Sequence, residues 1–171
     1  CVALADVCAP ATRYVRASIT AVVPGGAGLR DSRDAATATK LVHAVCGRRV
    51  ARTGPGTLTC AKCARAVSES DTESVFALAV DLDDGTAVRR ARVAATVAPT
   101  LLCLTPERFL SLGSHAAQLA ALAKPLGLEL VACLAAFFMP AAVASGDCRP
   151  GDAELLRIDA ACPAADVGVV D

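Results

Sequence analysis

The alternation of apolar and polar positions predicts a mainly β chain. Residues 14–23 are rich in β-branched side chains and end at a Pro-Gly-Gly turn, which is typical of a strand. Residues 75–82 alternate with a period of two, which gathers the large apolar side chains on one face: Phe76, Leu78, Val80 and Leu82. The sequence Asp83-Asp84-Gly85 then predicts a hairpin turn, with a return strand over residues 86–97 that stops at Pro99.

Two later apolar stretches predict strands over residues 128–139 and 155–161, and a helical segment precedes them at about 105–124. Thr105-Pro106-Glu107 has the residues of a helix start, and Ser114 is placed to cap a second short helix. Residues 27–40 are expected to form a polar loop. The predicted order is strand, insertion, strand, strand, helix, strand, strand, which is that of a five-stranded OB-fold barrel.

The insertion, at about 41–68, contains two pairs of potential metal ligands. His43 and Cys46 form the first pair, Cys60 and Cys63 the second, and thirteen residues separate the pairs. A Gly-Pro-Gly turn in the middle of the spacer favours a hairpin that brings the pairs together. Two such pairs suit one tetrahedral zinc ion, so we predict a zinc ribbon between the first two barrel strands.

Two other interpretations of these residues remain at this stage. Cys46 could be a small buried hydrophobe and His43 a surface residue, with Cys60 and Cys63 forming a redox pair. A zinc-dependent hydrolase would need an open coordination position, whereas four protein ligands leave none. No other catalytic constellation is visible, so the chain is expected not to be an enzyme.

Composition narrows the class of protein. Seventeen basic residues balance seventeen acidic ones among 171, which is unlike a dedicated high-affinity nucleic-acid binder. Nine cysteines, an odd number, argue against a secreted disulfide framework and favour a reducing compartment.

The length suits a single domain over residues 1–171. Because the chain begins with Cys1, we expect it to be part of a larger protein. The apolar residues 126–144 contain Glu129 and Pro140 and predict a buried strand with its exit loop.

The combination of an OB-fold with this ribbon resembles the C-terminal domain of the replication protein A large subunit. The resemblance is carried by Cys46-Gly-Arg-Arg-Val50, the spacer, Cys60-Ala-Lys-Cys63 and the strand beginning at Phe76. That family uses four cysteines, and this chain departs from the pattern at His43. The resemblance implies a structural zinc ion.

Within that family the chain resembles the C-terminal OB domain of shieldin complex subunit 2, through residues 12–24 and the Arg52-Thr-Gly-Pro-Gly56 turn. That resemblance implies a nuclear complex at sites of DNA damage that protects double-strand-break ends from resection and promotes end joining. Its expected partner is shieldin complex subunit 1. The alternative is an OB subunit of a replication or telomere complex, replication protein A-like or CST-like, with tighter single-stranded DNA binding.

Candidate contact residues follow from charge and apolarity. Basic residues on the first strand, the ribbon and the third strand could contact DNA phosphates: Arg13, Arg16, Arg48, Arg49, Arg52, Arg89, Arg90 and Arg92. Aromatic residues are only 3%, so binding to single-stranded DNA is expected to be weak and salt-dependent. The helical segment is more apolar than an exposed crossover needs, and its predicted partner-binding residues are Phe109, Leu112, Leu119 and Leu122.

Overall fold

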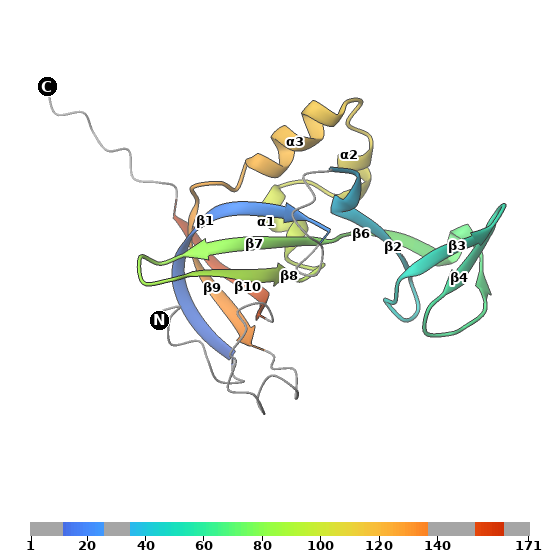
Figure 1. Cartoon of the computed structure of the whole chain (residues 1–171), viewed down its shortest axis with the longest axis horizontal. Coiled ribbons are helices and arrows are strands. Elements are labelled where there is room, and N and C mark those ends of the chain that lie inside the picture. Colours follow the sequence, from blue (N-terminus) through green and yellow to red (C-terminus); the bar gives the residue numbers. More distant parts are fainter. Residues whose placement is uncertain (1–11, 26–34, 137–152, 163–171) are drawn as a thin grey trace, which may run out of the picture.

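Five strands form the body of the protein (Figure 1). The computed structural model describes residues 12–25, 35–136 and 153–162. The barrel strands are β1 (Thr12–Pro24), β7 (Leu78–Asp83), β8 (Val88–Val93), β9 (Glu129–Ala136) and β10 (Ala153–Cys162).

The barrel closes in the order β1-β7-β8-β10-β9, and β9 pairs back onto β1. All neighbours are antiparallel except β8 and β10, which run parallel. This five-stranded arrangement is OB-like. The mainly β composition and the order of elements expected from the sequence are therefore confirmed.

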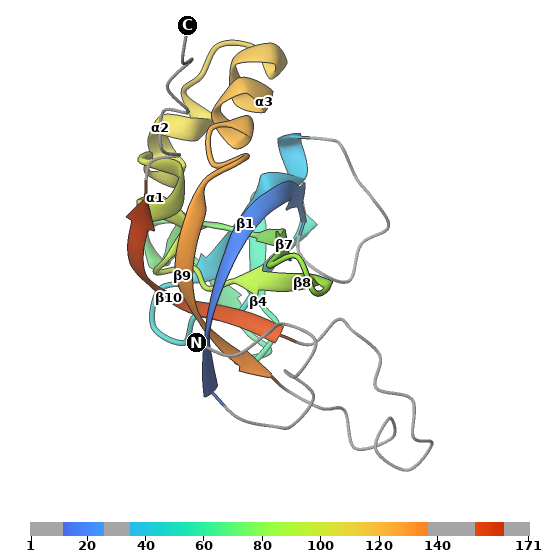
Figure 2. The ribbon, with the colours of Figure 1, turned by 90° about the vertical axis from the view of Figure 1, so that its left-hand side faces the viewer.

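Strand β1 serves both sides of the barrel because it is long and bent. Residues 12–18 pair with β9, whereas residues 18–24 pair with β7. The register with β7 shifts between Ile19 and Ala21, where a bulge increases the local bend. Figures 1 and 2 show the resulting curve of β1 around the body.

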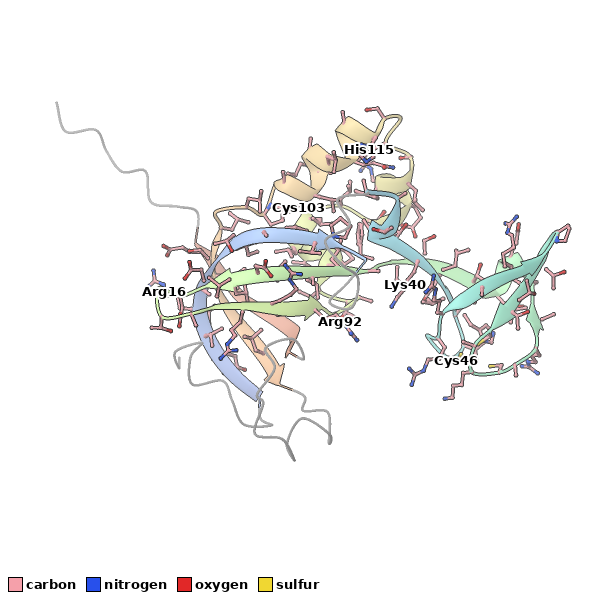
Figure 3. All side chains as sticks on the ribbon, in the orientation of Figure 1. Arg16, Lys40, Cys46, Arg92, Cys103 and His115 are labelled. Carbon is pink, nitrogen blue, oxygen red and sulfur yellow. The ribbon has the colours of Figure 1, made fainter. Side chains whose placement is uncertain are left out.

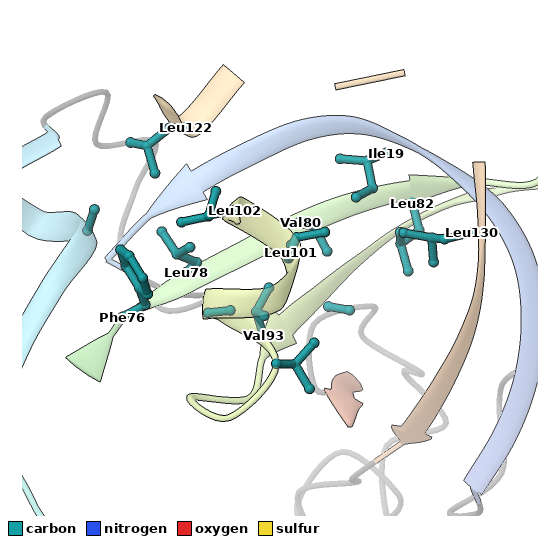
Figure 4. Close-up of a cluster of buried hydrophobic side chains, with 14 of the residues drawn as sticks. Ile19, Phe76, Leu78, Val80, Leu82, Val93, Leu101, Leu102, Leu122 and Leu130 are labelled. Atoms are coloured by element: carbon teal, nitrogen blue, oxygen red, sulfur yellow. The ribbon is translucent and has the colours of Figure 1, made fainter. Parts of the chain in front are cut away.

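Three short helices connect β8 to β9 and contribute to the barrel core. They are α1 (Ala98–Leu102), α2 (Pro106–Leu110) and α3 (His115–Ala123), and they lie together over one side of the barrel (Figures 1 and 2). Figure 4 shows that helix and strand side chains meet in one buried cluster, which includes Leu78, Val80, Leu101, Leu102 and Leu122. The helical segment therefore completes a core that the strands alone leave open.

The single strand predicted over residues 75–82 is in fact two strands, and that prediction was wrong. Phe76 ends β6 (Thr72–Phe76), and Leu78 begins β7. Between them, the Ala77 N–H donates to the Ala38 carbonyl at 2.7 Å, and the Ala77 carbonyl accepts from the Gly25 N–H at 2.7 Å. These two bonds transfer the chain from one sheet to another. Apolar alternation continues unchanged across the break and so conceals it.

Helix starts were predicted more accurately than strand ends. The Thr105 hydroxyl accepts from the Arg108 N–H, and Ser114 accepts from the Ala117 N–H, as their sequence positions indicate. However, β8 ends at Val93 rather than at residue 97, because Pro99 lies in the first turn of α1. Proline suits the first turn of a helix as well as a strand end. The helical segment thus begins at Ala98, earlier than expected.

Other predictions meet the limits of the described residues. The expected loop over residues 27–40 contains η2 (Ala35–Ala38), a 3₁₀ helix, and residues 26–34 lie outside the described part of the chain. The strand expected over residues 128–139 corresponds to β9, which covers residues 129–136. Residues 137–152 lie outside the described part of the chain. Within the described residues no helix has the length and apolarity needed to cross a membrane.

We expect Phe109→Ala to destabilise the barrel by about 3–5 kcal/mol. Phe109 is 1% exposed and packs edge-on against Phe76, with ring centroids 5.6 Å apart. Leu110→Ala is the matched control, because Leu110 is 50% exposed on the same helix. Urea denaturation of both variants measures the difference. A loss below about 1 kcal/mol for Phe109→Ala would contradict this account of the core.

Candidate metal centre

An insertion between β1 and β7 projects from the barrel (Figure 1). Its stalk is a two-stranded ladder of β2 (Thr39–His43) and β6, and its outer part is a three-stranded sheet. The sheet strands are β3 (Val50–Gly54), β4 (Thr57–Cys60) and β5 (Ala66–Val67). The insertion therefore spans 39–76, which is wider than the 41–68 expected. We call residues 39–76 the ribbon.

Two similar turns carry the four candidate ligands. His43 ends β2, and its carbonyl accepts from the Cys46 and Gly47 N–H groups at 3.1 and 2.8 Å. Cys60 ends β4, and its carbonyl accepts from the Ala64 N–H at 2.9 Å. The fifth residue of each turn is left-handed, with φ of 63° at Gly47 and 53° at Ala64. Each turn curls back over its first ligand and points its second ligand toward the other turn.

The ligand atoms of His43, Cys46, Cys60 and Cys63 all lie within 4.8 Å of one another. Cys46 Sγ is 3.4 Å from Cys60 Sγ and 3.9 Å from Cys63 Sγ. His43 Nδ1 is 3.3 Å from Cys46 Sγ and 3.5 Å from Cys63 Sγ. A tetrahedral zinc ion gives edges of about 3.8 Å between sulfurs and about 3.6 Å between sulfur and nitrogen. The four residues thus fit one zinc ion.

Burial decides between the interpretations of His43. Its side chain is 4% exposed, and Cys60 is fully buried beside it. His43 is therefore not the surface residue of the alternative interpretation, and Cys46, Cys60 and Cys63 are all free thiols. Cys46 and Cys63 are half-buried. The cluster has the donor set of a structural site that could hold a metal such as zinc.

Hydrogen bonds give the two thiols of the second turn different pKa values. The Cys63 N–H, 3.5 Å from Cys60 Sγ, is the main cause that lowers the pKa of Cys60 to about 6. The hydrogen bond that the Cys63 thiol donates to Cys60 is the main cause that raises the pKa of Cys63, and burial raises it further. A thiolate is the form that binds metal. The fold therefore prepares Cys60 for a cation, whereas Cys63 gives up its proton less readily.

The carboxylate of Asp71, next to the first ligand turn, also has a shifted pKa. The Asp71 carbonyl accepts from the Ala44 N–H at 2.9 Å, which ties the ribbon's acidic segment to the first turn. Bonds from Ser68 are the main cause that lowers the pKa of Asp71, and the charges of His43 and Arg65 lower it further.

The predicted DNA-contacting arginines of the barrel differ in their surroundings. Arg90 makes a two-point ion pair with Asp81, at 2.7 and 3.0 Å, and Arg16 contacts Glu129 at 3.0 Å. Arg89 is half-buried, and Arg92 is exposed (Figure 3). The side chain of Arg13 lies outside the described residues. The charge of Arg90 is already balanced in the folded protein.

The basic residues of the ribbon are arranged differently. Arg48, Arg49 and Arg52 are exposed, and no ion pair with another described residue holds them. Lys62 and Arg65 share this exposure, and so does Lys40 on β2, which the sequence interpretation missed (Figure 3). The signal was present as a long stretch without acidic residues. From residue 35 to residue 68 the chain has six basic residues and no carboxylate.

The predicted partner-binding residues of the helices are divided by burial. Phe109 and Leu122 are 1% and 4% exposed and belong to the core, so they offer no free surface. Leu112 is partly buried against the same core, and Leu119 is 39% exposed. The prediction of a partner surface narrows to Leu119 with part of Leu112. The sequence could not tell which residues of these helices are buried, because helices this short show no clear amphipathic period.

Comparison with known proteins places this fold in a family. The family model for cell division control protein 24, OB domain 3, matches residues 7–124. The chain belongs to this OB-domain family. No curated protein matches the domain by sequence.

Solved structures agree on the fold of this OB domain. A replication protein A heterotrimer bound to single-stranded DNA matches it with a TM-score of 0.59 and 15% identity, over 91% of this chain and 33% of that one. Yeast replication protein A bound to single-stranded DNA gives a TM-score of 0.60 and 13% identity. That match covers 89% of this chain and 78% of the yeast chain. The domain thus spans about a third of the length of the first of these chains. Identities this low show the fold.

We expect Cys60→Ser to abolish stoichiometric zinc binding and to unfold the ribbon. Cys60 is the most deeply buried residue of the cluster, and serine provides no thiolate. Cys103→Ser is the matched control, because Cys103 is exposed and remote from the cluster in sequence. Elemental analysis of the purified variants measures zinc per chain. Full zinc content in Cys60→Ser, or none in the unaltered protein, would contradict the assignment.

Zinc affinity is expected to fall as the pH falls, and to fall more steeply below about 6. The raised pKa of Cys63 makes its deprotonation costly already near neutral pH. Cys60 takes up its proton only near its pKa of about 6. Competition with a chromophoric chelator between pH 8 and pH 5 measures the affinity. A pH-independent affinity would show that thiolates do not bind the ion.

Proposed function

We propose that this protein is a non-enzymatic OB subunit of a DNA-maintenance complex that binds single-stranded DNA weakly, through phosphate contacts. The observation that carries the proposal is the exposed basic surface of the ribbon. Six basic residues lie there with no carboxylate between residues 35 and 68. A surface of this kind attracts the DNA backbone without regard to sequence.

The barrel contributes less than the ribbon to the proposed binding of single-stranded DNA. Tyr14 is 45% exposed on β1, so it offers one ring on which a base could stack. Arg16 and Arg90 are bound to carboxylates and release little free energy when they meet a phosphate. We therefore assign most of the phosphate contacts to Arg48, Arg49 and Arg52, supported by Lys62 and Arg65. Binding by these contacts is weak and depends strongly on salt.

Zinc has a structural role in this proposal. When bound, it would be held by His43, Cys46, Cys60 and Cys63, which fill a tetrahedral shell and leave no position for substrate. The ion would fix the two turns and thereby the basic residues in and beside them, Arg48, Arg49, Lys62 and Arg65. This arrangement supports a binding function and gives no route to hydrolysis.

The comparisons favour a replication-type or telomere-type role over break-end protection. The matched family is an OB domain of cell division control protein 24, and the similar structures are replication protein A bound to single-stranded DNA. One of those structures is a heterotrimer. We propose a similar assembly for this domain, in the nucleus, with Leu119 on the partner side. The narrower resemblance to shieldin complex subunit 2 has no support among these findings.

Neutralising the ribbon arginines tests the DNA proposal. The variant Arg48→Gln, Arg49→Gln, Arg52→Gln should lower the dependence of log K on log salt by about two, since each lost phosphate contact removes about 0.7 for a single strand. The matched control removes three exposed charges elsewhere: Arg16→Gln, Arg108→Gln, Lys124→Gln. Fluorescence anisotropy with a labelled oligonucleotide, at several salt concentrations, measures both. Equal slopes for the two variants would contradict a ribbon surface, and no binding by the unaltered domain would contradict the proposed function.

A further inference from the structure

The segment between β5 and β6 has a composition unlike the rest of the ribbon. It reads Ser68-Glu-Ser-Asp-Thr-Glu-Ser74, so every residue is a hydroxyl or a carboxylate. The 3₁₀ turn η3 (Glu69–Asp71) lies at its centre, and residues 68–71 are all exposed. All three carboxylates of the ribbon are in this one segment, next to six basic residues that precede it. Metal binding and DNA binding, as proposed above, use none of these side chains.

Two serines in this segment have carboxylates at the same offsets. Ser68 is followed by Glu69 and Asp71, and Ser70 by Asp71 and Glu73, in each case one and three residues later. Acidophilic serine/threonine kinases select such serines, because basic side chains in their substrate groove pair with carboxylates at those positions. We propose that Ser70 is a phosphorylation site for a kinase of this class.

Hydrogen bonding favours Ser70 over Ser68. The Ser68 hydroxyl donates to Asp71 Oδ2 at 2.6 Å and holds the turn. A phosphate on Ser68 would replace that bond with repulsion between two anions. Ser70 contacts only the Ser68 hydroxyl, at 2.7 Å, among the side chains described. Phosphorylation of Ser70 therefore leaves the bond from Ser68 to Asp71 in place.

The reaction needs ATP and the kinase as co-reactants. The Ser70 Oγ forms a bond to the γ-phosphorus of ATP, while the bond from that phosphorus to the bridging oxygen breaks. ADP leaves with the bonding electrons, and the hydroxyl proton passes to a carboxylate of the kinase. The product is a phosphoserine with about −1.5 to −2 charges at neutral pH.

The new charge would act on the basic surface of the ribbon. The Ala44 N–H bond to the Asp71 carbonyl holds the acidic segment against the first ligand turn, whose next residues are Arg48 and Arg49. The ribbon has six basic and three acidic side chains, so one phosphate of about −1.5 to −2 charges removes about half to two-thirds of the excess positive charge. This consequence rests on the proposed DNA binding, whereas the modification site itself does not.

The experiment treats the purified chain with Mg-ATP and a purified acidophilic kinase, and measures phosphate per chain by intact mass with peptide mapping. We expect phosphate on Ser70, nearly complete loss of that phosphate in Ser70→Ala, and a strong reduction in Glu73→Gln, which removes the distal carboxylate. Ser68→Ala is the matched control and should still be phosphorylated at Ser70. Absence of phosphate on Ser70, or unchanged labelling in Ser70→Ala, would overturn the site.

The phosphorylated and unmodified chains are then titrated with the labelled oligonucleotide at low salt. We expect the Kd to rise by about threefold to tenfold on phosphorylation, with Ser70→Ala treated in parallel showing no change. An unchanged Kd would overturn the effect on DNA. If the unmodified chain binds no DNA while Ser70 is phosphorylated, the proposed function fails and the modification site stands.

Discussion

The convergence of one histidine and three cysteines on a single point is the constraint on which the ribbon depends. Apart from Phe76, which ends the ribbon and packs in the barrel core, the ribbon buries only three large apolar side chains, Val42, Val50 and Leu58. At about 1.5–3 kcal/mol each, they contribute less than a structural zinc ion, whose apparent binding free energy is about 10–16 kcal/mol. A metal ion held by these four residues would therefore be the main source of stability for the ribbon, as it is for other small lobes with few buried apolar side chains.

The barrel does not share this dependence. Its core combines strand residues with side chains from all three helices. The barrel closes through a short parallel pairing in which residues 153–155 of β10 lie beside residues 91–93 of β8. The ribbon enters and leaves through neighbouring points, where Ala77 bonds to Ala38 and Gly25. Because these bonds join backbone to backbone, the ribbon's stalk is held to the barrel independently of side chains in the ligand cluster. Loss of metal should thus affect the ribbon before it affects the barrel.

The barrel and the ribbon also differ in how their charges are distributed. On the barrel, strand pairing places Arg90 opposite Asp81 and Arg16 beside Glu129 on β9, so these charges neutralise one another. On the ribbon, the acidic residues are confined to the segment of residues 68–74, and the charged side chains that precede it are all basic. Net charge over the whole chain is zero, yet its distribution provides a localised surface for an anionic polymer.

The sequence by itself determined the local features whose causes lie within a few residues. Ligand spacing, helix caps at Thr105 and Ser114, and the Asp83-Asp84-Gly85 turn could be predicted because each depends on neighbouring backbone groups. Only the tertiary structure decided that Ala77 divides one apolar stretch between two sheets, that Phe109 is core rather than surface, and which arginines are paired. Those outcomes depend on residues distant in the chain that meet only when the barrel closes, so no local pattern could specify them.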